Sequence, residues 1–241
     1  MRVIRVLSAI SIAASIAAAA AVTPGQAAGQ QQPPTVQMPR PGVPQIMTLE
    51  GNFVRVAYNN EGYVILGYQL ANRSVGEPWM LLEVGLTVMD RVPDYTLMRD
   101  ALSLETPDGK TVPLPTTSEY RQAEGSVQAL QNREKVQRDS INYFPPSASQ
   151  GCRLGFFADL GAPAMAWDQV ELSSRRACLG RLYFQVPGGI TYGQYWLNVK
   201  FAEGLVRVPF RILTKDEEKL LSKNFKSIKK QVDAAFRPKK G

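Results

Sequence analysis

Apolar side chains recur at every second position in several stretches between residues 50 and 213. The runs that show this pattern are Leu82–Val88, Leu182–Val186, Leu197–Phe201 and Val206–Ile212. A period of two is that of a β-strand with one face on a core and the other in water. The pattern therefore predicts antiparallel strands. Pro209 lacks the N–H that a ladder needs, so the last run is expected at a sheet edge or a bulge.

Short turn sequences separate the apolar runs. Asn59–Gly62, Pro107–Gly109 and Ala202–Gly204 each end in glycine. Short strands joined by tight turns are typical of an antiparallel β-sandwich. No regular alternation of strand and helix supports a parallel sheet. We therefore expect residues 48–213 to form a mainly β domain, a β-sandwich.

One segment interrupts the strand pattern. Thr116 and Glu119 have the spacing of a capping box, which favours a helix start. We expect residues 117–138 to form a helical crossover between the two halves of the sandwich. The residues compatible with its apolar face are Val127, Leu130 and Val136.

Three segments of the first half have the sequence texture of a known family. They are Tyr63–Asn72, Trp79–Val88 and Leu102–Lys110. Over residues 54–115 the chain resembles the telokin-like immunoglobulin-fold domains of bacterial extracytoplasmic proteins. The resemblance implies an antiparallel immunoglobulin-like β-sandwich that works as a non-catalytic interaction module. It assigns no functional residue to this chain.

The first 47 residues differ in composition from the rest. Two arginines precede the apolar stretch Val6–Val22, and small residues favour cleavage after Ala27. We expect a signal peptide over residues 1–27 and a Pro/Gln-rich linker over residues 28–47, because this composition cannot bury a core. An uncleaved anchor over Val3–Val22 is the alternative. Either one makes the protein periplasmic or secreted, in a compartment that permits disulfides.

The chain contains no histidine and only two cysteines, Cys152 and Cys178. Without histidine the usual general base and the commonest metal ligand are missing, so we expect no catalytic triad and no metal site. The cysteines are expected to form a structural disulfide, since redox-active pairs are spaced more closely. Asp159, Asp168 and Glu171 lie between them, but spacing alone does not predict a catalytic pair. We expect a protein that is not an enzyme and has no cofactor.

Positive charge is concentrated at the C-terminal end. Residues 28–213 contain 17 basic and 17 acidic side chains, whereas residues 214–241 contain nine basic and four acidic ones. A nucleic-acid-binding protein usually carries its basic residues on the folded body. The neutral body and the export signal therefore argue against nucleic acid as a partner.

Residues 214–241 have the pattern of a basic amphipathic helix. Lysines surround an apolar stripe with 4-3-4 spacing, made of Leu221, Phe225, Ile228 and Val232. Three interpretations stay open. The stripe packs on its own β-domain, it binds an envelope protein or forms a coiled coil, or the helix makes a peripheral contact with an anionic membrane.

Tyr192, Tyr195 and Trp196 lie close together in the sequence near several glycines. If exposed, they form a surface for a glycan or a protein partner; the alternative is that they fill and cover the core. The sequence thus predicts an exported, non-catalytic interaction or scaffold module of the bacterial cell envelope. The alternative function is that of a carbohydrate-binding, or weakly carbohydrate-active, extracytoplasmic protein.

Overall fold

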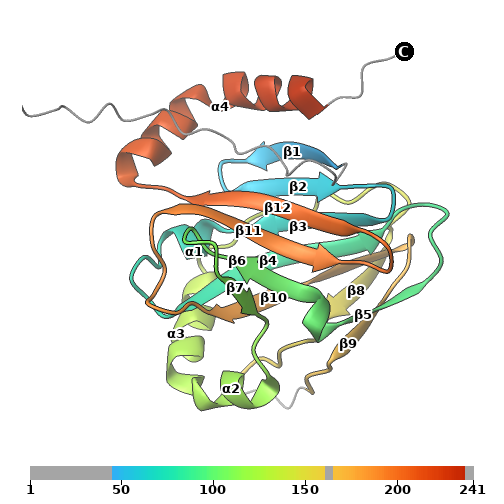
Figure 1. Ribbon diagram of the computed structural model, residues 1–241, viewed down its shortest axis with the longest axis horizontal. Coiled ribbons are helices and arrows are strands. Elements are labelled where there is room, and N and C mark those ends of the chain that lie inside the picture. Colours follow the sequence, from blue (N-terminus) through green and yellow to red (C-terminus); the bar gives the residue numbers. More distant parts are fainter. Residues whose placement is uncertain (1–44, 161–164, 237–241) are drawn as a thin grey trace, which may run out of the picture. The chain divides into compact units, whose positions relative to one another are not determined.

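The computed structural model describes residues 45–160 and 165–236, and strands predominate in it (Figure 1). The strands are β1 (Ile46–Gly51), β2 (Val54–Tyr58), β3 (Gly62–Gly67), β4 (Trp79–Val88), β5 (Tyr95–Met98), β6 (Leu102–Glu105), β7 (Thr111–Pro113), β8 (Gln150–Leu154), β9 (Gln169–Leu172), β10 (Arg176–Gln185), β11 (Gly193–Lys200) and β12 (Leu205–Ile212). The helices are α1 (Gln69–Asn72), α2 (Thr117–Gln122), α3 (Glu124–Glu134) and α4 (Lys215–Phe236), with a 3-10 turn, η1, at Arg99–Ala101. The predicted signal peptide, and the predicted linker up to residue 44, lie outside the described residues.

The described strands form three sheets. The largest has the order β1-β2-β3-β4-β10-β8, the second has the order β12-β11-β6-β7, and β5 pairs with β9. The predicted turns at Asn59–Gly62, Pro107–Gly109 and Ala202–Gly204 are confirmed, because each joins two hydrogen-bonded neighbours. The protein is therefore mainly β with several sheets and a C-terminal helix.

The prediction that all strands pair in antiparallel fashion is wrong for β8. This strand runs parallel to β10, with Cys152 opposite Cys178 in the register. A parallel pair needs a long connection, and the loop, β9 and turn between β8 and β10 supply it. The sequence Gln150–Leu154 has only two apolar residues, Cys152 and Leu154, which is too few to predict the strand or its direction.

The six-stranded and four-stranded sheets share one hydrophobic core. Leu82 of β4 and Leu182 of β10 are direct partners in the larger sheet, and both are fully buried. Leu197 and Val208 are partners in the smaller sheet and are buried as well. The period-two pattern therefore identified the side chains that face the core.

The opposite face of β4 is also buried, which corrects the expectation that this face lies in water. A segment between α3 and β8 crosses it, and two glycines make room for that segment. A Cβ atom at Gly67 would lie 2.7 Å from Asp139, and one at Gly85 would lie 2.7 Å from Phe144. Glu83, on the same face, accepts a hydrogen bond from the Asp139 N–H at 2.6 Å. The larger sheet is therefore covered on both sides at its centre.

The helical crossover is confirmed, with a shorter extent than expected. The capping box at Thr116 starts α2, and Ala123 interrupts the helix before α3. Val127 and Leu130 are buried under α3, as predicted. Val136 is exposed, because α3 ends two residues before it.

The strand that contains Pro209 is an edge strand, as predicted. Gln45 covers part of that edge, because its side-chain amide accepts a hydrogen bond from the Arg207 N–H at 2.9 Å and donates one to the Arg207 carbonyl at 2.6 Å. Gln45 directly precedes β1, a strand of the other sheet. The predicted linker, residues 28–47, therefore extends too far, since Met47 is a fully buried core residue of β1.

Candidate functional site

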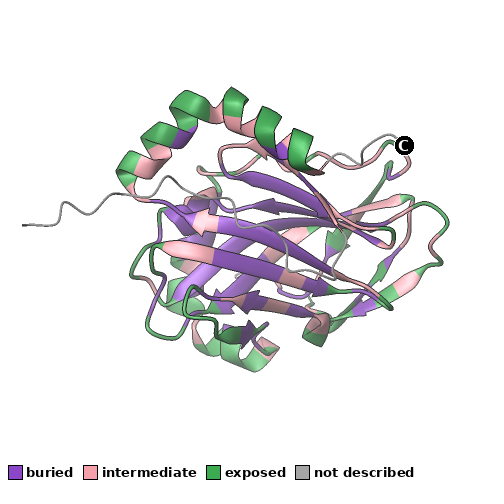
Figure 2. Ribbon diagram, turned by 45° about the horizontal axis from the view of Figure 1, so that its top comes forward, coloured by how far each residue is buried: buried purple, intermediate pink, exposed green. Residues whose placement is uncertain are grey.

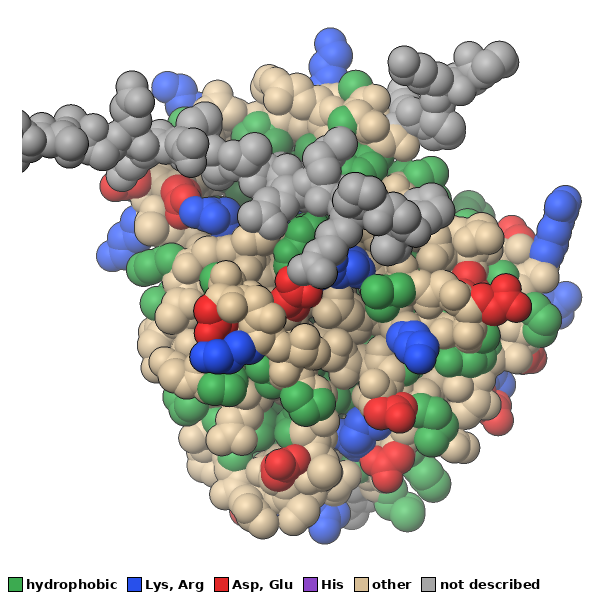
Figure 3. Space-filling view, in the orientation of Figure 1, with side chains coloured by type: hydrophobic (Ala, Val, Ile, Leu, Met, Phe, Trp, Pro, Cys, Tyr) green, Lys and Arg blue, Asp and Glu red, His purple; other side chains and the backbone are tan. Residues whose placement is uncertain are grey.

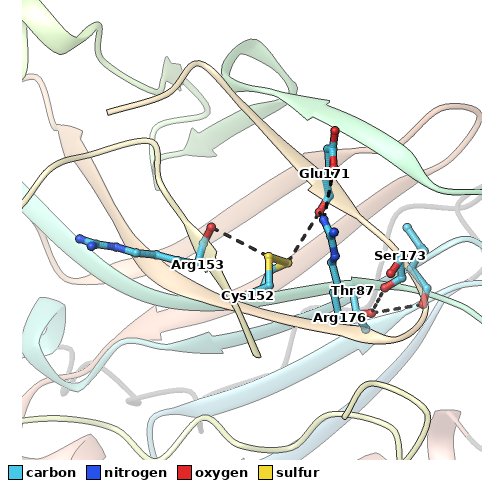
Figure 4. The surroundings of a disulfide bond; sticks show 8 residues. Thr87, Cys152, Arg153, Glu171, Ser173 and Arg176 are labelled. Atoms are coloured by element: carbon cyan, nitrogen blue, oxygen red, sulfur yellow. Dashed lines mark hydrogen bonds and ion pairs between the residues drawn. A yellow bond between two sulfur atoms is a disulfide. The ribbon is translucent and has the colours of Figure 1, made fainter. Parts of the chain in front are cut away.

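The predicted disulfide between Cys152 and Cys178 is confirmed. It fastens the edge strand β8 to β10, and Cys178 lies in the main core. Figure 4 shows the bond beside Glu171 of β9, whose carbonyl oxygen lies 3.9 Å from the Cys178 sulfur. The described residues contain no free cysteine. This placement fits a structural disulfide that holds an edge strand on the sheet.

The surface predicted from Tyr192, Tyr195 and Trp196 does not form. Tyr195 is 0% exposed and Trp196 is 6% exposed, while Tyr192 alone reaches solvent. The Tyr195 hydroxyl donates to the Thr191 carbonyl, and the Arg207 guanidinium lies 4.6 Å from the Trp196 ring centre. Both rings are thus taken up by internal packing, which was the alternative interpretation.

Trp167 is the exposed tryptophan, at 56%, and the sequence pattern did not single it out. Its indole lies against Gly155, where an added Cβ atom would be 2.9 Å from the ring. The Trp167 backbone N–H donates to the Gly155 carbonyl at 2.8 Å. An aromatic ring that is more than half exposed can stack on a planar ligand. The contact joins residues twelve positions apart, so no short sequence pattern predicts it.

The three acidic residues between the cysteines do not converge. Asp168 pairs with Arg99 at 2.7 Å, and Glu171 pairs with Arg176 at 3.3 Å. Asp159 lines a cavity to which neither Asp168 nor Glu171 contributes. Asp168 and Glu171 are therefore each held by a different arginine.

The cavity that Asp159 lines has a volume of about 220 Å³ and lies on the outer face of the larger sheet. Its sides are the segment that follows α3, around Arg138 and Ile141, and the segment that follows β8, around Phe157. Gly180 and Arg181 of β10 lie between these two sides. Segments that are distant in the sequence therefore line one cavity.

Six charged side chains line this cavity and alternate in sign from one contact to the next. In order they are Glu83, Arg138, Glu134, Arg181, Asp159 and Arg153. The successive nitrogen–oxygen distances are 3.5, 3.0, 2.9, 2.7 and 3.2 Å. We call these six residues the charge chain. Glu83 and Arg181 are direct register partners on β4 and β10, which places the chain across two neighbouring strands.

The members of the charge chain differ widely in burial. Glu134 is 1% exposed and Glu83 is 5% exposed, whereas the side chains of Arg138 and Arg153 are 64% and 59% exposed. These two acids therefore lie at the floor of the cavity and two guanidinium groups lie at its mouth. Burial raises the pKa of Glu83 to about 7, although Arg138 and the Asp139 N–H oppose the rise. Within residues 45–160 and 165–236 no group of acidic or sulfur side chains is arranged to hold a metal ion.

The C-terminal helix packs on its own domain, which is the first of its three interpretations. Leu221 and Val232 are buried, and Phe225 and Ile228 are partly buried against the main core. These four residues were predicted as a partner-binding face, and that prediction is corrected, because the face covers β1. Lys229 also binds the edge strand through the Leu49 carbonyl and through the Glu50 carboxylate at 2.9 Å. Figure 2 shows exposed residues along the outer side of α4 and less exposed ones toward the sheet.

The outer side of α4 carries a row of lysines. The exposed members are Lys215, Lys219, Lys223, Lys226 and Lys230. At about 100° per residue they fall within about 80° of arc, centred about 150° from the apolar stripe. We call these five residues the lysine row. Figure 3 shows basic side chains standing out from the surface of α4.

Comparison of the chain with protein-family models, with curated proteins and with solved structures gives no match. Among the described helices, none combines the length and the apolar character that crossing a bilayer requires. The features of the described residues that bear on function are therefore the charge chain, the lysine row and the exposed Trp167.

Proposed function

We propose that this protein is an exported, non-catalytic interaction module of the bacterial cell envelope, and that its lysine row docks it on an anionic membrane surface. The observation that carries the proposal is the row itself. Five lysines occupy one side of a helix whose apolar side is already occupied by β1. The helix then acts as a rigid electrostatic contact and does not insert into the lipid.

The distribution of basic residue types supports this role. Residues 28–213 contain 14 arginines and three lysines, whereas residues 214–241 contain eight lysines and one arginine. Arginine suits fixed pairs with carboxylates, and lysine is a hydrated point charge. Many arginines of the β-domain do form such pairs, for example Arg181 with Glu134 and Arg133 with Glu77. In the described residues, Lys223, Lys226 and Lys230 have no ion pair within 4 Å.

The expected strength follows from the number of charges. A lysine near an anionic leaflet contributes about 1 kcal/mol, so five contribute about 5 kcal/mol, or three to four orders of magnitude in partitioning. This attraction acts within about a Debye length and weakens as salt is added. Binding is therefore expected to be reversible and dependent on ionic strength.

Vesicle co-sedimentation tests the proposal. The protein should bind vesicles of phosphatidylglycerol and phosphatidylcholine at low salt and not vesicles of phosphatidylcholine alone. The triple variant K223Q/K226Q/K230Q should bind at least tenfold more weakly. The variant K110Q/K135Q/K200Q removes the same charge from exposed positions of the β-domain and should bind like the parent. Equal losses in the two triple variants, or no binding at all, would overturn the proposal.

A second candidate function is carbohydrate binding, and the exposed ring of Trp167 favours it. The test compares retention of W167A and the parent on polysaccharide and peptidoglycan columns. Loss of retention in W167A, with the fold intact by circular dichroism, supports glycan stacking on this ring. Lack of retention of the parent on every column refutes it.

We also propose that the β-domain is an immunoglobulin-like sandwich related to the telokin-like domains. The run of antiparallel neighbours β2, β3 and β4 and the hairpin β6–β7 support this relation over residues 54–115. The parallel strand β8 and the helices α2 and α3 would then be additions to that framework. An experimental structure in which these strands have another order would contradict the assignment.

A further inference from the structure

We propose that the cavity lined by the charge chain is a binding site for a small zwitterion, a molecule of amino-acid size that carries one carboxylate and one ammonium group. This site is independent of the lysine row, because it lies on the outer face of β4 and β10 and involves no residue of α4. Failure of either proposal leaves the other standing.

The carboxylate of Glu134 at the floor of the cavity can accept further hydrogen bonds. Glu134 is 1% exposed, and each of its carboxylate oxygens lies within 3.0 Å of an arginine nitrogen, from Arg138 or Arg181. Even so, neither oxygen receives a hydrogen bond of acceptable geometry from the described residues. A carboxylate accepts about four hydrogen bonds, and buried polar atoms are normally satisfied. Both oxygens expose less than 1 Å², so an ammonium group would donate to Glu134 by taking the place of Arg138, whose side chain is 64% exposed.

The two arginines at the mouth of the cavity can bind an anion. Arg138 contacts Glu134 and Glu83 through its Nε atom, and Arg153 contacts Asp159 through one terminal nitrogen. Each guanidinium has five N–H donors, so both retain donors that can point toward solvent at the mouth. The two arginines come from opposite sides of the cavity, one after α3 and one on β8. Guanidinium groups bind carboxylates through two parallel hydrogen bonds, which fixes orientation as well as charge.

The size of the cavity restricts the ligand. A volume of about 220 Å³ is the share of roughly seven water molecules in the liquid. Pockets for drug-sized ligands begin at about 300 Å³. Apolar side chains, among them Phe157 and Leu154, also line the cavity and can contact a short side chain. An ammonium group at the floor and a carboxylate at the mouth, a few bonds apart, match a free amino acid.

Charge balance favours a zwitterion over a simple ion. With all six groups ionised, which for Glu83 requires a pH above about 7, the three acids and three arginines of the charge chain cancel. A lone anion or a lone cation would leave a net charge in a partly enclosed site, at a cost in desolvation. A zwitterion brings no net charge, and each of its ends meets the complementary end of the cavity.

Isothermal titration calorimetry and two-dimensional NMR of the protein with glycine, alanine, serine and glutamine test the proposal. Acetate and methylammonium, each of which carries one of the two groups, are the ligand controls. At least one amino acid should bind saturably, at least tenfold more tightly than either control ion. Its chemical-shift changes should map to residues of the charge chain.

Variants at the mouth and the floor then assign the contacts. R153Q, at an exposed position, should weaken amino-acid binding about tenfold or more, because it removes a charged hydrogen-bond donor. R121Q, an exposed arginine on α2 outside the cavity, is the matched control and should bind normally. E134Q should weaken binding as well, and its circular dichroism spectrum checks that it folds. No saturable binding of any amino acid, or equal binding by R153Q and the parent, would overturn the proposal and leave the charge chain as a structural ion network.

Discussion

Replacing Glu83 with glutamine should remove a pH dependence of stability that the burial of this side chain creates. Glu83 lies under the segment that carries Asp139, and its carboxylate faces Arg138 and Glu134. Burial raises its pKa from 4.5 to about 7. Because the folded state binds the proton more tightly, the stabilising contribution of protonated Glu83 is fully present below pH 4.5. It is lost as the pH rises through about 7.

The size of the effect follows from the shift. Each pKa unit corresponds to 1.36 kcal/mol, so the rise from 4.5 to about 7 corresponds to about 3 kcal/mol of unfolding free energy. The glutamine side chain of the E83Q variant is neutral at every pH and can still accept the hydrogen bond from the Asp139 N–H. The E83Q variant should therefore gain about 3 kcal/mol relative to the parent between pH 4.5 and pH 8.

Urea unfolding of the parent and E83Q at a series of pH values measures this difference. Other acids with a raised pKa, such as Asp139, act in both proteins, so to first order their contributions cancel in the difference. The free-energy difference should be constant below pH 4.5, rise between pH 4.5 and about 7, and level off above pH 7. A difference that is flat from pH 4.5 to 8 would refute the argument, since Glu83 would then titrate in the folded protein as it does in the unfolded chain.

Three further changes test other parts of the fold. Reduction of the Cys152–Cys178 bond removes a constraint on the unfolded chain and should lower the free energy of unfolding by about 3 kcal/mol, measured as a lower urea midpoint in reductant. The control is a C152A/C178A variant, whose midpoint should not respond to reductant. Gly85→Ala should destabilise the protein, because the new Cβ atom would lie 2.7 Å from the ring of Phe144. Gly125→Ala in α3, where the new Cβ atom has no neighbour within 4 Å, should stabilise the protein by up to about 1 kcal/mol. Equal urea midpoints for these two variants would contradict the packing described for the outer face. Leu221→Ala should cost about 2–3 kcal/mol and increase proteolysis within α4, and unchanged protease resistance would show that this residue does not hold the helix on the sheet.

The strands and turns were predictable because their signals are local. Alternation in Val206–Ile212, the turn at Pro107–Gly109 and the capping box at Thr116 each involve residues a few positions apart. The disulfide was predicted from the two cysteines in a chain that we expect to be exported. For the strands, the turn and the capping box, a short window of sequence contains the physical cause, either a hydrogen bond or an alternating face. The disulfide joins residues 26 positions apart, and its prediction needed only the count of cysteines.

The remaining features depend on contacts between distant residues. Trp196, which the sequence singled out, is buried with the Arg207 guanidinium 4.6 Å from its ring centre, whereas Trp167 contacts Gly155 and stays 56% exposed. In the sequence, Gly67 and Gly85 look like residues that weaken a strand. In the structure they leave space for the segment between α3 and β8 that covers the sheet. The charge chain spans residues 83 to 181, and its one visible hint is that Glu83 and Arg181 occupy polar positions in alternating strands.

The amide of Gln45 has a mechanical consequence. Gln45 is the residue at which the described chain enters the β-domain, and its side chain binds the backbone of Arg207 on β12 while the next residue starts β1. A force applied through the N-terminal end therefore reaches both sheets at once. It loads two hydrogen bonds on β12 together with the β1–β2 ladder, so the first strand is not simply peeled away from the rest of the sheet. If this end is attached to the envelope, the point of entry is a two-sheet anchor that resists tension.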